Sequence, residues 1–452
     1  MLNDFFKKYD ILIILIIAVI SRLLLAFKTV TPILWDAAVY MLNAKWFIGS
    51  HVYLELIRPP VWPLILSFFY LLNISDNGMV FVSLLFSALS IVMTYLLAKE
   101  LFGTKAGIIA SLLLMFTPLH IVWSTMSYTE IPASLFLLIS LYFLYKGLNN
   151  EKFQYLSVFF ASIAFLTRYP LVLLFPSIII CLWMQKKMNL KKFLLMTAVF
   201  ITPVIPWMVY NMLLTESPIF SFVYGMFWVS QASSSPFWYF LVNSPTVFSV
   251  LLVPIAFSVL AIRDYKNKEI QIPLIFLVLF LAYSAFMLEH KELRYLLPVV
   301  PLFAILASKY LSKFNWKILL LLIPLFAISA YHSNYIFNTE FYNCPEIITS
   351  SQNLSGTVYS VFWPQTALYG NVTVAAPRPT PDKIDILMHN TSSLDRFIDY
   401  DSKISYVVVA DDRYAWIDYT SNFSFWDSIP YLLLQKQING SCFAIRIYKV
   451  IY

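Results

Sequence analysis

The sequence predicts a mainly α-helical membrane protein that crosses the bilayer many times and carries a small α/β domain in its C-terminal part. The first observation is composition: 60% of the 452 residues are hydrophobic, 12% are charged, and the mean hydropathy is +0.74. Soluble domains are about half apolar and about a quarter charged, so this composition excludes an ordinary soluble protein. The second observation is a change of pattern, because residues 333–452 contain only short, β-rich apolar runs.

Eleven apolar stretches are candidates for membrane spans, because a span needs about 20 mostly apolar residues. They are residues 10–27, 79–98, 106–124, 131–147, 153–167, 170–184, 193–211, 246–262, 271–288, 295–311 and 317–332. The first stretch follows a charged segment, as the core of a signal peptide does. It lacks a small-residue cleavage site, so we expect it to be retained as an anchor.

The basic residues predict the orientation of these spans. If Lys7 and Lys8 hold the N-terminus in the cytoplasm, alternation places most of the later Lys and Arg clusters on the same side, as the positive-inside rule requires. The net charge of +7 is therefore a topology signal and does not indicate nucleic-acid binding. Residues 333–452 then lie outside, and they contain five Asn-x-Ser/Thr acceptor sequences, at Asn353, Asn371, Asn390, Asn422 and Asn439.

The first exterior loop, residues 28–78, contains two apolar segments that are too short to cross the bilayer. Residues 36–49 and 61–73 are expected to be amphipathic helices in the outer interface, with Trp62 and Tyr70 as interfacial anchors. We expect two domains: a membrane module over residues 1–332, which includes this loop, and an exterior domain over residues 333–452.

The exterior domain is predicted to contain at least four strands. They correspond to residues 357–362, 372–375, 404–410 and 443–450. Cys344 and Cys442 both belong to this domain, and an exterior compartment permits a disulfide between them, although two free thiols remain an alternative.

Acidic and basic residues gather at the outer membrane boundary in this topology. The set comprises Asp36, His51, Glu55, Arg58, Glu130, Arg168, Glu289, His290, Lys291, Glu292 and Arg294. Ionisable groups at this depth are costly unless they are paired or used. Transfer of a sugar from a lipid phosphate needs a carboxylate for the acceptor and cations for the departing phosphate, and this set contains both.

Four motifs occur in a recognisable order. They are Arg22 followed by Asp36-x-x-x-Tyr40-x-x-x-Ala44 and Arg58-Pro59-Pro60; Ser127-Tyr128-Thr129-Glu130; Leu166-Thr167-Arg168-Tyr169-Pro170; and Arg294-Tyr295-x-x-Pro298-x-x-Pro301. This order resembles the GT-C superfamily of lipid-phosphate-sugar-dependent glycosyltransferases, especially the branch that contains protein O-mannosyltransferases and the aminoarabinose transferase of lipid A. The resemblance covers about residues 10–310.

The resemblance implies an enzyme of the cell membrane that moves a sugar from a polyprenyl or dolichyl phosphate to a protein, lipid or glycan acceptor on the outer face. Asp36 is then the base or acceptor-orienting residue, and Glu130 assists it. The donor phosphate is expected to bind Arg58, Arg168, Lys291, Arg294 and Tyr295.

A metal site is not expected at Asp36. Many family members have an acidic pair in the first loop, whereas Ala37 follows Asp36 in this chain. His51 and Glu55 have i,i+4 spacing and are weak metal candidates together with His290, because two ligands are too few for a site. No cofactor is certain, and a divalent metal remains an alternative.

Each residue also has a structural interpretation. Asp36 is a suitable N-cap for the helix that follows it. Glu130 can form a structural pair with a neighbouring arginine, Arg58 can be an interfacial anchor, and Arg294 can simply flank a span. Arg22 must be buried or paired, and a first-loop acid is one candidate partner.

Two other functional classes remain open. A transporter or flippase for a lipid-linked glycan is the main alternative, although transporters tend to have repeated halves and charges near the middle of the membrane. An inactive membrane scaffold is the second.

Overall fold

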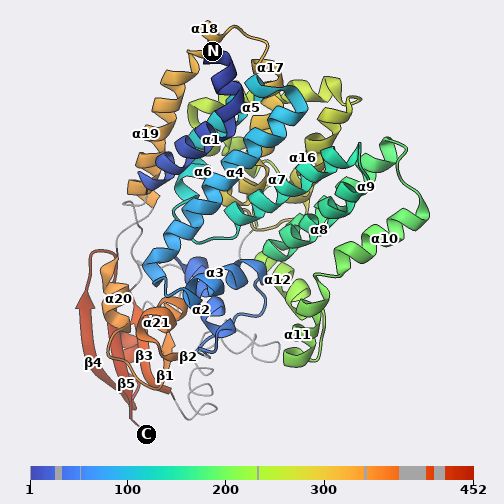
Figure 1. Cartoon of the computed structure of the whole chain (residues 1–452). Coiled ribbons are helices and arrows are strands. Elements are labelled where there is room, and N and C mark those ends of the chain that lie inside the picture. The colour runs from blue at the N-terminus through green and yellow to red at the C-terminus, as the bar shows by residue number, and fades with distance from the viewer. Residues whose placement is uncertain are drawn as a thin grey trace. The chain divides into compact units, whose positions relative to one another are not determined.

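The computed structural model describes residues 2–25, 33–50, 52–231, 234–340, 344–375, 404–411 and 423–451. The chain divides into two compact units (Figure 1). The helical unit comprises Met1–Thr29, Leu56–Ile65 and Ile74–Asn338, and the sheet unit comprises Val30–Glu55, Leu66–Asn73 and Thr339–Tyr452. Most of the first loop groups with the C-terminal residues in this division, and the expected membrane module over residues 1–332 and exterior domain over residues 333–452 stay a prediction.

The helical unit consists of helices of very different lengths, in addition to the short 3-10 turn η1 (Asp76–Gly78) before α4. They are α1 (Leu2–Leu23), α4 (Met79–Phe102), α5 (Thr104–Phe116), α6 (Pro118–Trp123), α7 (Glu130–Gly147), α8 (Lys152–Thr167), η2 (Tyr169–Leu173), α9 (Leu174–Met184), α10 (Leu190–Ile201), α11 (Ile205–Thr215), α12 (Phe220–Gln231), α13 (Tyr239–Val242), α14 (Ser244–Phe248), η3 (Ser249–Leu251), α15 (Leu252–Ala256), η4 (Phe257–Asp264), α16 (Lys268–Phe286), η5 (Leu293–Val299), α17 (Val300–Leu311), α18 (Trp316–Leu319) and α19 (Leu322–Glu340).

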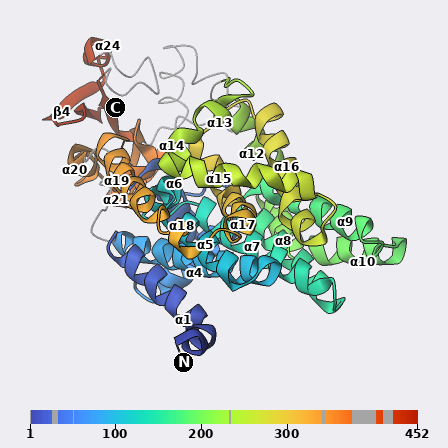
Figure 2. The ribbon, with the colours of Figure 1, turned by 90° about the horizontal axis from the view of Figure 1, so that it is seen from above.

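Close packing of α4, α5, α7 and α8 forms the centre of this unit (Figure 2). Small residues permit the close approach, as is typical of helices in membranes. A Cβ atom on Gly107 of α5 would lie 2.9 Å from the backbone oxygen of Tyr95 in α4. One on Gly147 of α7 would lie 2.6 Å from the side chain of Gln154 in α8. These glycines therefore set the spacing of the central helices.

Several helices have the length and hydropathy of membrane spans. Among the described residues, six pass this test: Asp76–Phe102, Glu130–Gly147, Ser244–Asp264, Lys268–Phe286, Leu293–Leu311 and Trp316–Phe337. The pair Leu190–Ile201 and Ile205–Thr215, bent by 51°, makes a seventh if it is one span. Shorter apolar helices cover Val61–Leu71, Thr104–Phe116, Lys152–Thr167 and Tyr169–Met184. The mainly helical, multi-span class is confirmed, while the count of eleven spans stays a prediction.

The sheet unit contains a five-stranded mixed sheet in the order β2-β1-β3-β5-β4 (Figure 1). Its strands are β1 (Thr357–Ser360), β2 (Thr373–Ala375), β3 (Ile404–Ala410), β4 (Leu432–Asn439) and β5 (Ala444–Val450). β1 pairs in parallel with β2 and β3, whereas β5 pairs antiparallel with β3 and β4. The four predicted strands are present, and β4 is an additional one.

Within the described residues of the C-terminal part, three helices accompany the sheet: α20 (Pro345–Ser351), α21 (Trp363–Gly370) and α24 (Phe423–Asp427). Cys344 and Cys442 form a disulfide with a Cα–Cα distance of 5.6 Å. This bridge links the start of α20 to the segment before β5, and it resolves the alternative of two free thiols.

The first loop forms two helices, as expected, but they are not simple interfacial helices. α2 (Trp35–Phe47) has eight buried residues and packs against α21 within the sheet unit. α3 (Val61–Leu71) begins in the helical unit and ends in the sheet unit. Trp62 is completely buried, and its indole Nε1–H donates to the backbone oxygen of Ser127 at 2.9 Å. The expectation that Trp62 is an interfacial anchor was therefore wrong.

Candidate active site

Glu130 is the centre of the candidate site. It is the first residue of α7, where the helix dipole favours a negative charge. Only 1% of its surface is exposed, so the carboxylate is removed from bulk solvent. A carboxylate buried to this degree needs a cationic partner.

Two arginines supply that partner. Arg168 Nη1 donates to Glu130 Oε1 at 2.8 Å, and Arg294 Nε lies 3.6 Å from the same oxygen. Arg168 lies just after α8, where extended backbone ends the helix before Tyr169-Pro170. Arg294 is the second residue of η5. Three segments distant in sequence therefore bring one carboxylate and two guanidinium groups together.

Glu292 forms a second carboxylate contact on Arg294. Arg294 Nε and Nη2 donate to its two oxygens at 2.5 and 3.0 Å, a bidentate geometry, and Tyr295 donates its hydroxyl to Oε1 at 3.2 Å. His290 Nε2 lies 3.0 Å from the same oxygen. Burial by itself raises the pKa of Glu292, but the charge of Arg294 and hydrogen bonds from His290 and Arg294 hold that pKa below its usual range. Glu292 is therefore ionised at neutral pH.

Aromatic rings cover both guanidinium groups. Arg294 lies over Tyr128, 4.6 Å from the ring centroid, and 5.4 Å from that of Trp123. Arg168 lies 4.7 Å from the ring centroid of Tyr295. Such stacking suits the planar guanidinium and holds it in one orientation. The cations are therefore fixed in place and shielded from water.

Two polar atoms of this cluster have no hydrogen-bond partner among the described residues. They are Oε2 of Glu130 and Nε of Arg168, and both are buried. An unsatisfied buried polar atom costs about 1–3 kcal/mol, so such atoms commonly mark a place where a ligand or a water binds. One is an acceptor and the other a donor. The cluster can therefore receive a hydroxyl group and an anionic oxygen.

Lys291 makes different contacts from its arginine neighbours. Its Nζ donates to the backbone oxygens of Ser235 and Leu288 at 2.8 and 2.5 Å, and burial lowers its pKa. These bonds fasten the loop after α16 to the segment before α13. Arg58 lies half-buried in the helical unit, shortly before α3. Their assignment to a donor phosphate stays a prediction.

Asp36 lies in the first turn of α2, in the sheet unit. The N-cap position belongs to Leu34 and has no side-chain capping bond, so the interpretation of Asp36 as the N-cap was wrong. The segment is fastened to α21: Trp35 meets Trp363 edge to face at 4.2 Å between ring centroids, and the Ile33 backbone N–H donates to the hydroxyl of Tyr369 at 2.7 Å. The C-terminal domain therefore positions the helix that carries Asp36.

The weak metal candidates do not form a cluster in the described part of the chain. His51 lies outside the described residues. Glu55 is buried, and Tyr53 donates its hydroxyl to Glu55 Oε2 at 3.1 Å. The one group of three potential ligands found among the described residues is Cys344, Glu346 and Cys442, and its two sulfurs are joined in the disulfide.

Arg22 is buried inside the helical unit with a set of polar partners from α4, α5 and α6. Its Nε donates to Ser87 Oγ at 2.8 Å, and its Nη2 donates to Met115 O at 3.1 Å and to His120 Nδ1 at 2.8 Å. His120 Nε2 then donates to Ser90 Oγ at 3.1 Å, because its other nitrogen is the acceptor. This network fixes α6, which leads into the segment of Trp123, Tyr128 and Glu130.

Sequence reasoning grouped Glu130, Arg168 and Arg294 on one side of the membrane, and the structure brings them into contact. It did not assign roles to Glu292, Trp123 or Tyr128. The available signal for Glu292 was its place between two basic residues in one loop; for Tyr128 it was the motif that also contains Glu130. Trp123 gave no signal, since its contact with Arg294 joins the last residue of α6 to η5, two segments distant in sequence.

Comparison with known proteins was consistent with this arrangement. A family model described as "Dolichyl-phosphate-mannose-protein mannosyltransferase" matches residues 57–210, which include Arg58, Glu130 and Arg168. No curated protein sequence matches the chain.

Solved structures resemble the chain over most of its length. ArnT from Cupriavidus metallidurans, bound to undecaprenyl phosphate, matches with a TM-score of 0.73 and 13% identity over 96% of this chain and 97% of that one. The oligosaccharyltransferase AglB from Archaeoglobus fulgidus, in complex with an inhibitory peptide and a dolichol-phosphate, matches with a TM-score of 0.60 and 12% identity. This match covers 90% of this chain and 70% of AglB. The arabinofuranosyltransferase AftD from Mycobacteria matches with a TM-score of 0.53 and 14% identity. This match covers 97% of this chain and 41% of AftD.

The fold is thus that of polytopic membrane glycosyltransferases. The chain therefore shares its fold with these three enzymes, and its residues 57–210 match the mannosyltransferase family model.

Proposed function

We propose that the protein transfers a sugar from a polyprenyl phosphate to an acceptor hydroxyl or amide on the outer face of the membrane. The observation that carries the proposal is the buried cluster in which Glu130 contacts Arg168 and Arg294. Among the described residues, Glu130 Oε2 and Arg168 Nε are left without a hydrogen-bond partner. Support for the donor class comes from the fold, since ArnT and AglB were solved with undecaprenyl phosphate and dolichol-phosphate.

The reaction assigns a task to each charged group. The acceptor oxygen or nitrogen attacks the anomeric carbon, the bond between that carbon and the phosphate oxygen breaks, and the electron pair leaves with the polyprenyl phosphate. The leaving group gains negative charge, so fixed guanidinium groups stabilise the transition state more than the ground state. Arg168 and Arg294 perform this task, and Glu130 keeps both in position. Its Oε2 is available to a sugar hydroxyl.

Asp36 is the residue that we propose takes the acceptor proton. A hydroxyl is a poor nucleophile until a base removes its proton in the transition state, and one positioned carboxylate contributes about 10²–10⁴-fold. Its support is the order of sequence motifs and its place in the first turn of a helix that α21 holds.

The orientation is also part of the proposal. The distribution of Lys and Arg favours a cytoplasmic N-terminus and an extracytoplasmic sheet unit. The Cys344–Cys442 disulfide favours the same side, because disulfides persist in oxidising compartments.

The test is sugar transfer by the purified full-length protein from defined polyprenyl-phosphate sugars in detergent, with Asp36→Asn and Glu130→Gln beside wild type. We expect release of polyprenyl phosphate by wild type, a loss of about 10²-fold or more for Asp36→Asn, and unchanged thermal unfolding. Equal transfer by wild type and Asp36→Asn would remove Asp36 from the mechanism. Movement of the lipid-linked sugar across vesicles without transfer would favour a flippase instead.

A further inference from the structure

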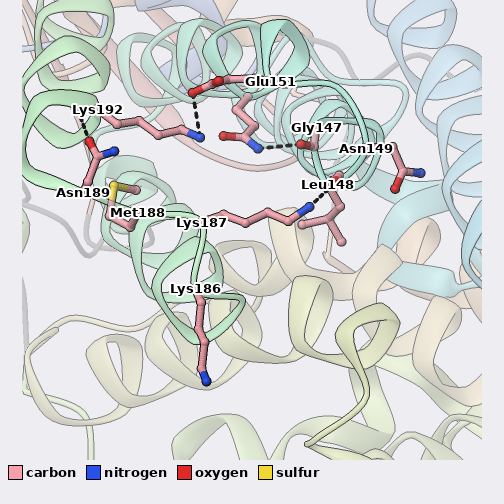
Figure 3. A pocket seen from close by; sticks show the side chains of 10 residues that line it. Gly147, Leu148, Asn149, Glu151, Lys186, Lys187, Met188, Asn189 and Lys192 are labelled. Atoms are coloured by element: carbon pink, nitrogen blue, oxygen red, sulfur yellow. Dashed lines mark hydrogen bonds and ion pairs between the residues drawn. The ribbon is translucent and has the colours of Figure 1, made fainter.

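A polar cavity lies at the end of α7 and α8 opposite to Glu130 and Arg168. It has a volume of about 390 Å³ and is formed by the α7–α8 turn, the loop between α9 and α10, and the start of α10 (Figure 3). Its lining residues are Gly147, Leu148, Asn149, Glu151, Gln154, Lys186, Lys187, Met188, Asn189 and Lys192. Every one of them belongs to the helical unit.

The cavity lies at the other boundary of the membrane. Glu130 begins α7 and Gly147 ends it, and the helix has 18 residues. At a rise of about 1.5 Å per residue it is about 27 Å long, close to the thickness of the hydrocarbon core of about 30 Å. Lipid headgroups occupy this depth. In the predicted orientation it is the cytoplasmic side.

The charges of the lining favour an anion. The lining contains three lysines and one carboxylate, that of Glu151, which pairs with Lys192 Nζ at 2.9 Å. Lys187 Nζ donates to the backbone oxygen of Leu148, which directs it across the cavity, whereas Lys186 points away (Figure 3). An ammonium group has three N–H donors, so Lys187 and Lys192 retain donors for a ligand.

A buried acceptor adds a second requirement. Gln154 is 2% exposed, and its Nε2 donates to the backbone oxygen of Gly147 at 2.5 Å. Its Oε1 is buried and has no partner among the described residues. A phosphate ester without an O–H group cannot donate to this acceptor, so a ligand that satisfies Gln154 Oε1 also carries a hydroxyl or ammonium donor near its phosphate.

We propose that this cavity binds a phosphate ester with an adjacent hydrogen-bond donor, such as the glycerol phosphate headgroup of an anionic phospholipid. Lys187 and Lys192 contact the phosphate, and Gln154 accepts from the neighbouring hydroxyl. Basic pockets between helices at the cytoplasmic side of membrane proteins are suited to such headgroups. This site is separate from the sugar-transfer cluster and does not depend on the proposed function.

The experiment counts bound lipids by native mass spectrometry of the full-length protein in detergent. The probes are phosphatidylglycerol, phosphatidylcholine and free glycerol phosphate. Each lysine near a headgroup contributes about fivefold in affinity, so Lys187→Gln is expected to bind phosphatidylglycerol about fivefold more weakly, and the double variant with Lys192→Gln about thirtyfold more weakly. Lys187 is exposed, so its single variant is expected to fold even if the double variant does not.

The matched control is Lys191→Gln. Lys191 is an exposed lysine of α10 that is not part of the cavity lining, and its substitution removes the same charge. Unchanged binding by this control, with weaker binding by Lys187→Gln, supports the site. If free glycerol phosphate shows the same pattern, the ligand is a soluble phosphate ester; if only the lipid binds, it is a headgroup. Three results would overturn the proposal: equal binding of phosphatidylglycerol and phosphatidylcholine, an equal loss of phosphatidylglycerol affinity in Lys187→Gln and Lys191→Gln, or no binding of any probe.

Discussion

Glu130 Oε1 accepts a hydrogen bond from Arg168 Nη1 at 2.8 Å, between the first residue of α7 and the residue that follows α8. The two helices pack side by side along their lengths, so the ion pair closes the end of a rigid antiparallel pair. Both side chains are largely buried, with 1% and 13% exposed. Removing both charges of a buried ion pair from water costs free energy that their attraction need not recover. A role of these charges in binding or catalysis therefore explains the pair more easily than a contribution to stability.

Replacement of Glu130 by Gln tests that use. The variant keeps the shape of the side chain but removes the counter-charge that Arg168 and Arg294 share. Arg168 loses its carboxylate partner, while Arg294 keeps Glu292. We expect the rate of sugar transfer to fall by roughly 10²-fold, which corresponds to about 2.7 kcal/mol of transition-state stabilisation. The measurement is kcat/KM for the lipid-phosphate sugar donor.

Glu100→Gln is the matched control for this change. Glu100 pairs with Lys146 at 2.7 Å. Both residues lie near the C-terminal ends of their helices, α4 and α7, whereas Glu130 is the first residue of α7. Both side chains are about one third exposed. Exposed pairs contribute about 0–1 kcal/mol, so this variant is expected to retain transfer. An equal loss of transfer in both variants would show that any break in the helical unit abolishes activity.

Arg294→Lys tests whether the guanidinium plane matters as well as its charge. Lysine cannot make the bidentate contact with Glu292 or the stacked contact with Tyr128. We expect at least a tenfold loss of kcat/KM while the net charge of the site is unchanged. Wild-type kinetics in this variant would contradict a role for fixed geometry.

Protonation of Glu292 gives an expected pH dependence. Its folded pKa is held below the ordinary value of 4.5, so its contribution to stability is fully present above that value and is lost as the pH falls toward the folded pKa. In wild type, the free energy of unfolding should decrease as the pH falls below ~4.5. Glu292→Gln should be less stable than wild type at neutral pH, and the difference should shrink in acid. A difference that is constant with pH would argue against the ion pair.

His120→Leu tests the buried network around Arg22. The change removes the acceptor of Arg22 Nη2 and the partner of Ser90, and it leaves a buried cation with fewer hydrogen bonds. We expect destabilisation of about 2–3 kcal/mol, visible as a lower thermal unfolding midpoint in detergent. An unchanged midpoint would mean that water or other groups replace the imidazole.

Removal of the disulfide tests the C-terminal domain. Cys344 and Cys442 are 98 residues apart. A disulfide that closes a loop of this length reduces the entropy of the unfolded chain, which stabilises the folded state by about 4–5 kcal/mol. The double Ser variant should therefore unfold at a lower temperature. Transfer should fall as well, because α21 in the same unit holds the helix of Asp36. Full transfer with a lowered midpoint would separate the domain from the reaction.

Much of the fold was predictable from local patterns. Long apolar runs predicted the helical membrane part, and short β-rich runs predicted the C-terminal α/β domain. Four of the five strands followed from β-branched sequences. β4 was missed because Leu432–Asn439 is polar in its second half, and it lies mostly exposed at the edge of the sheet. Edge strands need only one neighbour, so their sequences carry a weaker signal.

The candidate site was predictable in part. Topology alone placed Glu130, Arg168 and Arg294 on one side of the membrane. It could not show that Glu292 shares Arg294 with Glu130, because that depends on the turn into η5 and on side-chain directions. Trp62 illustrates the opposite error. An aromatic residue beside a short apolar helix indicates an interface anchor, yet tertiary packing buries it against Ser127 and Phe86.

The most direct test is a structure of the full-length protein with a polyprenyl phosphate bound. The account predicts that the phosphate lies within about 4 Å of the guanidinium groups of Arg168 and Arg294, and that Arg168→Gln abolishes its density there. A phosphate bound elsewhere, with both guanidinium groups still in contact with Glu130 and Glu292, would contradict the assignment of this cluster to the donor.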